Sequence, residues 1–132
     1  MSFLLKSMFE DGITINYTLR ALGNNYLLLA QAGEEHIGSI VLAIPRLSLE
    51  DSKRISSTVS VLNVIGHKDE EIARPLAKAL CKTTNQPAVA IAGIHYDGLR
   101  PYDIRRIQMI NEQAVKKVGD WVNELKKTVT KD

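Results

Sequence analysis

The 132-residue sequence predicts one α+β domain, in which an antiparallel β meander precedes a βαβ unit and a long C-terminal helix, with helices flanking the sheet. Three patterns support this fold class. Apolar and polar residues alternate over 13–21, which is typical of a half-buried strand. The order strand, helix, strand over 59–94 is typical of a βαβ unit. Apolar residues at steps of three and four after residue 103 indicate a long amphipathic helix.

The N-terminal half contains three predicted strands, at 13–21, 26–32 and 37–44. Residues 23–25 (Gly-Asn-Asn) tolerate positive φ, so the first two strands are expected to form a hairpin. A second turn signal at 33–35 precedes the third strand. We expect that strand to end at Pro45, because proline cannot donate to the sheet ladder. A short strand near 4–9 could precede the meander.

Residues 46–56 are polar and connect the two halves of the chain. This composition fits a solvated linker, and it fits equally a mobile lid or a short helix over a neighbouring site.

The second half is predicted to contain strands at 59–65 and 87–94 around a helix at 68–82. In such a unit the crossover is right-handed and the two strands run parallel. Pro75 interrupts the helical pattern, so the helix either kinks there or begins near Ala73. The apolar spacing places Cys81 on the inward face.

The final helix is expected to run from 103 to about 128. Trp121 lies on its apolar side, where an aromatic residue serves as core or as a dimer contact.

The composition excludes several classes of protein. Seventeen basic and 15 acidic residues give a net charge of +2, too balanced for a nucleic-acid surface. One cysteine cannot form an internal disulfide, and the first residues do not resemble a signal peptide, so a reducing cytoplasm is expected. No apolar run approaches the roughly 18 residues of a membrane span, and we expect no membrane partner.

All three histidines lie in short segments where an apolar run meets a turn: 33–38, 66–69 and 93–97. The second and third segments follow the two strands of the βαβ unit. Ligands of open α/β sheets bind outside the carboxyl ends of such strands, and the N-terminus of a helix favours an anion. We therefore predict that one ligand site is formed by His36, Gly66, His67, Lys68, Asp69, Gly93, His95 and Asp97.

Ordinary turn chemistry offers an alternative for several of these residues. Gly66 could allow a tight turn, Asp69 could cap the helix, and Asp97 could close an Asx turn. For His36 the alternative is a surface position in a hairpin loop. Neither capping nor turn formation calls for the other two histidines.

No catalytic residue and no metal ligand is predicted, because the sequence has no HxH, HxxxH or CxxC spacing and no nucleophile signature. The pattern indicates a binding crevice. Two alternatives stay open. A small lyase or hydrolase could act on an anionic substrate, with His67 and His95 as acid and base. A protein-binding assembly factor could use the long helix and a sheet edge.

Residues 61–74, with the motif Gly66-His67-Lys68-Asp69, and residues 90–97, with Gly93-Ile94-His95-Tyr96-Asp97, resemble the LpdD-like family. Residues 36–43 resemble a third segment of that family. The family is associated with gallate decarboxylase clusters and described as prenylated flavin chaperones. Its fold is similar to that of the small proteasome-assembly chaperones, which are dimers.

The resemblance implies a single LpdD-like domain over 1–132 that forms a homodimer. It also implies an accessory protein that binds prenylated FMN transiently and serves a UbiD-type decarboxylase. The flavin phosphate would lie at the helix start, at 66–69, and His36, His67 and His95 would contact the ligand. Pro75 departs from the family pattern.

Overall fold

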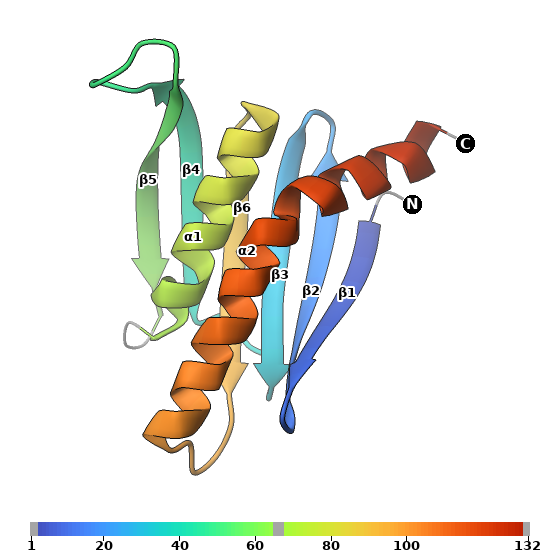
Figure 1. Cartoon of the computed structure of the whole chain (residues 1–132), viewed down its shortest axis with the longest axis vertical. Helices are drawn as coiled ribbons and strands as arrows, with labels where there is room; N and C mark the ends of the chain where they lie inside the picture. Colours follow the sequence, from blue (N-terminus) through green and yellow to red (C-terminus); the bar gives the residue numbers. More distant parts are fainter. Residues whose placement is uncertain (1–2, 65–67, 131–132) are drawn as a thin grey trace.

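A computed structural model describes residues 3–64 and 68–130 and shows a six-stranded mixed sheet with two helices across one face (Figure 1). The strands are β1 (Phe3–Glu10), β2 (Ile13–Leu22), β3 (Asn25–Gly33), β4 (Ser39–Leu47), β5 (Ile55–Asn63) and β6 (Ala88–His95). The helices are α1 (Lys68–Thr84) and α2 (Pro101–Thr130). The strand order is β1-β2-β3-β6-β4-β5. The α+β class and the long C-terminal helix are confirmed.

Strands β1, β2 and β3 pair antiparallel in chain order, which confirms the predicted hairpin of β2 with β3 and the short strand before it. Every second residue of β2, from Ile13 to Leu19, is buried beneath α2, as the alternation predicted. Leu22 pairs with Asn25, so the turn between β2 and β3 has only two central residues, 23 and 24. Gly23 adopts the positive φ that a two-residue hairpin turn requires.

The predicted third strand of the meander does not pair with the second. Strand β6 lies between them, parallel to β3 and antiparallel to β4. Its small residues Ala88, Ala90 and Ala92 are almost completely buried, and an apolar strand of this kind suits the sheet centre. Residues 34–38 therefore do not form a hairpin loop; they cross the end of β6.

Strands β5 and β6 run in the same direction, as the βαβ prediction required, but they are not neighbours. Strand β4 lies between them and pairs antiparallel with both. The parallel partner of β6 is β3, which comes from the N-terminal half.

Pro45 does not end β4, which continues to Leu47 in a hairpin with β5. The pairing of β4 with β6 stops at Ala43, so Pro45 has a neighbouring strand on one side only, where a missing donor is tolerated.

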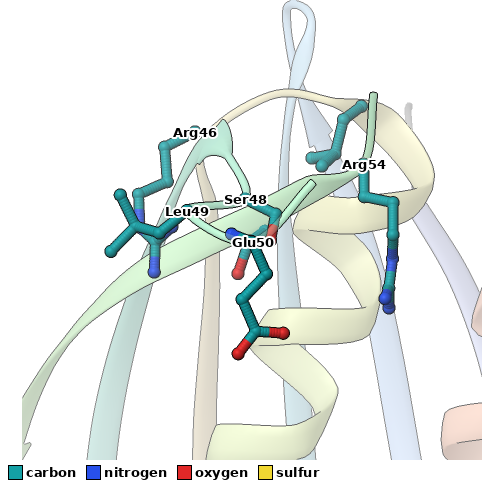
Figure 2. Close-up of a pocket in the computed structure, with 7 residues that line it drawn as sticks. Arg46, Ser48, Leu49, Glu50 and Arg54 are labelled. Carbon is teal, nitrogen blue, oxygen red and sulfur yellow. Dashed lines mark hydrogen bonds between the residues drawn. The ribbon is translucent and has the colours of Figure 1, made fainter. Parts of the chain in front are cut away.

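The predicted linker, residues 46–56, forms the tip of the hairpin between β4 and β5 and contains no helix. Backbone hydrogen bonds from Ser48 N to Arg54 O (2.8 Å) and from Arg54 N to Asp51 O (3.0 Å) close the tip. A cavity of about 360 Å³ lies there, and Arg46 and Arg54 lie on opposite sides of it (Figure 2). The tip and the 34–38 loop lie at opposite ends of β4.

Helix α1 packs on β4, β5 and β6 through an apolar face that includes Ile72, Leu76 and Leu80. It runs without interruption through Pro75, so a start near Ala73 is wrong. Cys81 is buried, as predicted, and burial raises the pKa of its thiol, which stays protonated near neutral pH.

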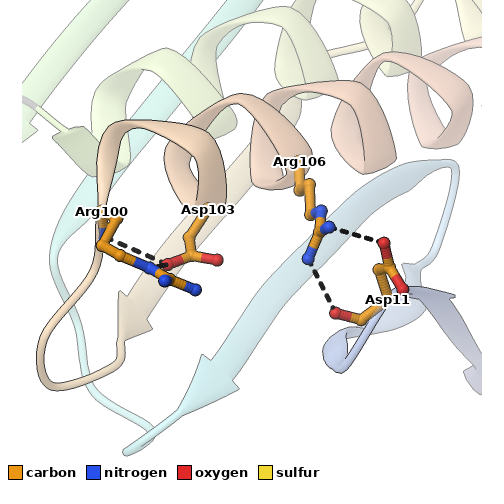
Figure 3. Close-up of polar contacts among 4 residues, drawn as sticks. All are labelled: Asp11, Arg100, Asp103 and Arg106. Carbon is orange, nitrogen blue, oxygen red and sulfur yellow. Dashed lines mark hydrogen bonds and ion pairs between the residues drawn. The ribbon is translucent and has the colours of Figure 1, made fainter.

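Helix α2 packs on β1, β2 and α1. Pro101 occupies its first position, where a missing N–H is harmless, and the Asp103 carboxylate accepts a hydrogen bond from Arg100 N (3.1 Å; Figure 3). The helix therefore begins two residues before the predicted start. Neither described helix is long and apolar enough to cross a membrane.

A buried polar link joins the sheet to both helices. The Tyr17 hydroxyl donates to Asn111 Oδ1 (2.9 Å), and Asn111 Nδ2 donates to the Ile72 carbonyl (3.1 Å). Burial raises the pKa of Tyr17, so the phenol keeps its proton and remains a donor. The Trp121 ring packs on Tyr17 at a centroid distance of 5.3 Å, which makes Trp121 a core residue of the chain itself.

A second link holds the start of α2 to the turn between β1 and β2. The Arg106 guanidinium donates to the Asp11 carboxylate (2.5 Å) and to the Asp11 carbonyl (3.0 Å), as Figure 3 shows. It also stacks on the Tyr102 ring, 3.7 Å from the centroid. The charged hydrogen bonds hold the turn to the helix, and the stacking contact within α2 orients the Arg106 guanidinium.

Replacing Asn111 by Ala should lower the free energy of unfolding by about 1–3 kcal/mol, because the buried Tyr17 hydroxyl loses its acceptor and the Ile72 carbonyl loses the donor from α2. Urea denaturation would measure the change. The control is Asn123→Ala, on the exposed side of the same helix, which should change stability by less than about 0.5 kcal/mol. Equal effects of the two substitutions would contradict the role given to Asn111.

Candidate functional site

Three strands that run in the same direction, β3, β5 and β6, end at one edge of the sheet, and α1 begins there (Figure 1). A cavity of about 510 Å³ lies at this edge. Its apolar lining comes from Ile37, Val64 and Ile94. Its polar side chains are Glu34, His36, Lys68, Asp69 and His95.

The loop 34–38 forms one wall of the cavity because it is bonded to β6 at both ends. Glu34 N donates to His95 O (3.1 Å), and Gly38 N donates to Ala92 O (2.9 Å). The Gln31 amide holds the middle of the loop: Oε1 accepts from His36 N (2.9 Å) and Nε2 donates to His36 O (3.0 Å). The position of His36 is therefore set by the sheet.

Three glycines allow this close approach. A Cβ at Gly93 would overlap the His36 carbonyl, and one at Gly38 would overlap the Asp69 carboxylate. Gly33 has a φ of +65°, and a Cβ there would overlap the His95 carbonyl. These glycines of the histidine segments are thus required because a side chain at any of them would overlap the backbone or the carboxylate that packs against it.

Asp69 connects the start of α1 to the end of β6. Its side chain is almost buried, at 8% exposure of the residue. Oδ1 accepts a hydrogen bond from Ile94 N (3.0 Å), and Oδ2 lies 3.4 Å from His36 Nε2. The carboxylate also lies in the first turn of α1, where negative charge is favourable. The Asp69 carboxylate therefore bonds to the backbone of β6. The helix-capping alternative would have it bond to the backbone of α1.

His36 and His95 lie side by side, with ring centroids 6.3 Å apart and ring planes at 88°. His36 Nδ1 lies 3.0 Å from Glu34 O, so both ring nitrogens of His36 face oxygen acceptors. His95 Nε2 lies 3.2 Å from the carboxylate of Asp97, whose side chain is fully exposed. Two imidazoles from separate segments therefore meet on one wall of the cavity.

The structure brings together four of the predicted site residues: His36, Lys68, Asp69 and His95. Gly93 is buried beneath the loop, and Asp97 lies beside His95 outside the cavity lining. Gly66 and His67 lie outside the described residues. The expected meeting of His67 with His95 is therefore not tested.

The 34–38 loop has a larger part in the site than the sequence pattern indicates. The alternative for His36 is a surface position in a hairpin loop, but the observed loop crosses β6 and places His36 beside His95. Gln31 and Gly38 also position the loop and are not among the predicted site residues; the Gly–His–Gly spacing of the first segment is a signal for Gly38.

A smaller cavity of about 80 Å³ adjoins the first and shares Lys68, Asp69 and Ile94 with it. Its other apolar lining comes from α1 and from the start of α2, including Ile72, Ile104 and Ile107. The polar cavity thus continues into an apolar recess between the helices.

Serine, threonine and cysteine are absent from the described lining of both cavities. No group of three or more His, Cys, Asp or Glu side chains that could hold a metal ion occurs within 3–64 and 68–130. The arrangement is suited to binding an anionic, partly apolar molecule.

Gly38→Ala should lower the free energy of unfolding by about 1–3 kcal/mol, because the added methyl group must displace the Asp69 carboxylate or the loop. The control is Gly119→Ala in α2, where the nearest neighbour of the added carbon is Thr83 at 3.8 Å. That change should raise stability by up to about 1 kcal/mol. Thermal or urea unfolding would measure both, and a fully stable Gly38→Ala protein would contradict the packing described.

The model of the prenylated flavin chaperone LpdD-like domain matches residues 10–123. No curated protein matches the chain.

Among solved structures, a chain in "Crystal Structure of a Novel Chaperone Complex for Yeast 20S Proteasome Assembly" is similar, with a TM-score of 0.55 and 18% identity. The alignment covers 95% of this chain and 98% of that one. At this identity the likeness concerns the fold alone. The family match spans nearly the whole chain, so the protein belongs to the prenylated flavin chaperone LpdD-like family.

Proposed function

We propose that the protein binds prenylated FMN transiently in the cavity at the carboxyl ends of β3, β5 and β6, and delivers it to a UbiD-type decarboxylase without catalysing a reaction. The observation that carries this proposal is the convergence of Lys68, His36 and His95 on one cavity, in a chain that belongs to this chaperone family.

The chemistry of the lining fits such a cargo. The volume of about 510 Å³ falls within the usual range of small-molecule sites. Lys68 and His95 can donate hydrogen bonds to a phosphate, and the N-terminus of α1 adds its positive dipole end. Ile37, Val64 and Ile94 supply apolar contact for a fused ring, and the adjoining recess suits a hydrocarbon substituent.

Transient binding is expected from the same lining. Glu34 and Asp69 place carboxylates beside the cationic groups, and a phosphate entering the cavity meets charges of both signs. The Asp69 carboxylate is partly satisfied by Ile94 N and His36, so its repulsion is reduced. Moderate affinity is useful for a protein that must release its cargo to an enzyme.

The client is proposed to be a UbiD-type decarboxylase subunit in the cytoplasm, and the chaperone is proposed to act as a homodimer. The family description supports the handling of prenylated flavin. The identity of the client rests on the association of this family with decarboxylase clusters.

A second candidate function is a small lyase or hydrolase. The contact between Asp69 and His36 Nε2 favours it, because a carboxylate that orients an imidazole is a common acid–base arrangement. Turnover of an anionic substrate by the isolated protein, lost in Asp69→Asn, would support this candidate over the chaperone.

The double variant Lys68→Ala/His95→Ala should bind FMN and prenylated FMN at least about tenfold more weakly, because two donors to the phosphate are lost. Titration calorimetry or flavin fluorescence under anaerobic conditions would give the dissociation constants. Lys82→Ala, in the last turn of α1, removes one positive charge far from the cavity and should leave binding unchanged.

The same variants should be compared in the maturation of an apo-decarboxylase supplied with prenylated FMN. The double variant is expected to slow the appearance of decarboxylase activity, while Lys82→Ala is not. Normal flavin retention and normal maturation with the double variant would show that this cavity is not where the flavin binds.

A further inference from the structure

We infer that the groove between α1 and α2 is a docking site for a basic segment of the client enzyme, in which an arginine or lysine stands next to an apolar residue. That such a client exists rests on the proposed function. The groove and the flavin cavity share no lining residue, so the occupant of the groove can be tested without flavin.

The two helices lie side by side on one face of the sheet (Figure 1). A groove of about 660 Å³ opens between them. Its apolar lining consists of Ile72 and Pro75 from α1 and Val115 from α2. Ile72 is buried and the other two are half-buried, so they form the floor, whereas the charged lining residues are exposed and form the rim. An apolar floor with a few polar groups around it is typical of a binding site.

The groove is held in shape by Asn111, which lines it and is itself only 3% exposed. The Asn111 carboxamide accepts a hydrogen bond from the Tyr17 hydroxyl (2.9 Å) and donates one to the Ile72 carbonyl (3.1 Å). These bonds fix α2 to the sheet and to α1 across the floor. The groove is therefore formed before a partner arrives, which lowers the cost of binding.

The rim of the groove carries negative charge that the chain does not use internally. Glu71 on α1 and Glu112 on α2 contribute a carboxylate each, and neither side chain has a hydrogen bond or an ion pair within the described residues. The neighbouring Glu70, by contrast, is paired with Arg74 at 2.6 Å. Lys116 is the one basic residue of the lining, so the groove is acidic in a chain whose net charge is +2. A cationic guest is complementary to this charge.

Pro75 adds a hydrogen-bond acceptor to the same groove. A proline inside a helix has no N–H, so the carbonyl four residues earlier, that of Glu71, lacks its usual helix donor. Residues four apart lie on one face of a helix, and both Glu71 and Pro75 line the groove. An N–H group of a partner can supply the hydrogen bond that Pro75 cannot make.

These features together favour a protein segment as the occupant. The guanidinium of arginine or the ammonium of lysine can donate both to the carboxylates and to the Glu71 carbonyl. A free metal ion or polyamine would neutralise the charges but leave the apolar floor in water. The groove also adjoins the apolar recess beside the flavin cavity, with which it shares Ile72 and Gln108. A segment bound there lies next to the cargo, where the enzyme that receives the cargo must approach.

The test is the affinity of the full chain for the apo form of a UbiD-type decarboxylase, measured without flavin by surface plasmon resonance. Glu112→Lys should raise the dissociation constant at least about tenfold, because a cation then faces the basic segment. Pro75→Ala should raise it about threefold, because the new N–H occupies the Glu71 carbonyl. This second variant should fold at least as well as the wild type, since alanine favours a helix.

Asp120→Lys is the matched control, because it makes the same reversal of charge at an exposed position of α2 outside the groove lining and should leave the affinity unchanged. Circular dichroism should show the same secondary structure in all variants. Client binding that is as tight in Glu112→Lys and Pro75→Ala as in the wild type, or absent from the wild type, would overturn the inference. FMN binding measured on the same samples separates the two proposals: a wild type that binds the client through the groove but fails to bind flavin contradicts the cavity and leaves the groove intact.

Discussion

The structure depends on the insertion of β6 between β3 and β4. This strand pairs parallel with one neighbour and antiparallel with the other, so the chain between those neighbours must pass across its end. The crossing segment lies so close to the strand that Gly93 and Gly33 have no room for a side chain. The contact between His36 and His95 is a direct result of this crossing.

Two buried polar side chains then define how the helices lie on the sheet. Asp69 bonds the backbone of β6 at the cavity end of α1, and Asn111 bonds the backbone of α1 from α2. Both side chains are buried, and each satisfies a polar group of another element that would be costly to leave unpaired. A helix that shifted along the sheet would lose these bonds, so the cavity wall formed by the start of α1 is held in place.

The one-sided arrangement of the helices gives the molecule two kinds of surface. On the covered side, the helix starts and strand ends leave a cavity with imidazoles, a lysine and carboxylates. On the uncovered side, the strands present leucine, isoleucine and valine to the surroundings. The first surface suits a small anionic molecule, and the second suits a flat apolar partner.

The sequence by itself determined the elements of the fold, their order and the class of the protein. Alternation identified β2, helical spacing identified α1 and α2, and the motifs around His67 and His95 carried the family likeness, because each of these signals is local. Only the tertiary structure decided the strand order, the continuation of β4 past Pro45 and the partner of His95. Periodicity reports which face of a strand is apolar and carries no information about which distant strand pairs with it. The meeting of His36 with His95 follows from such a pairing and could not be derived from either segment alone.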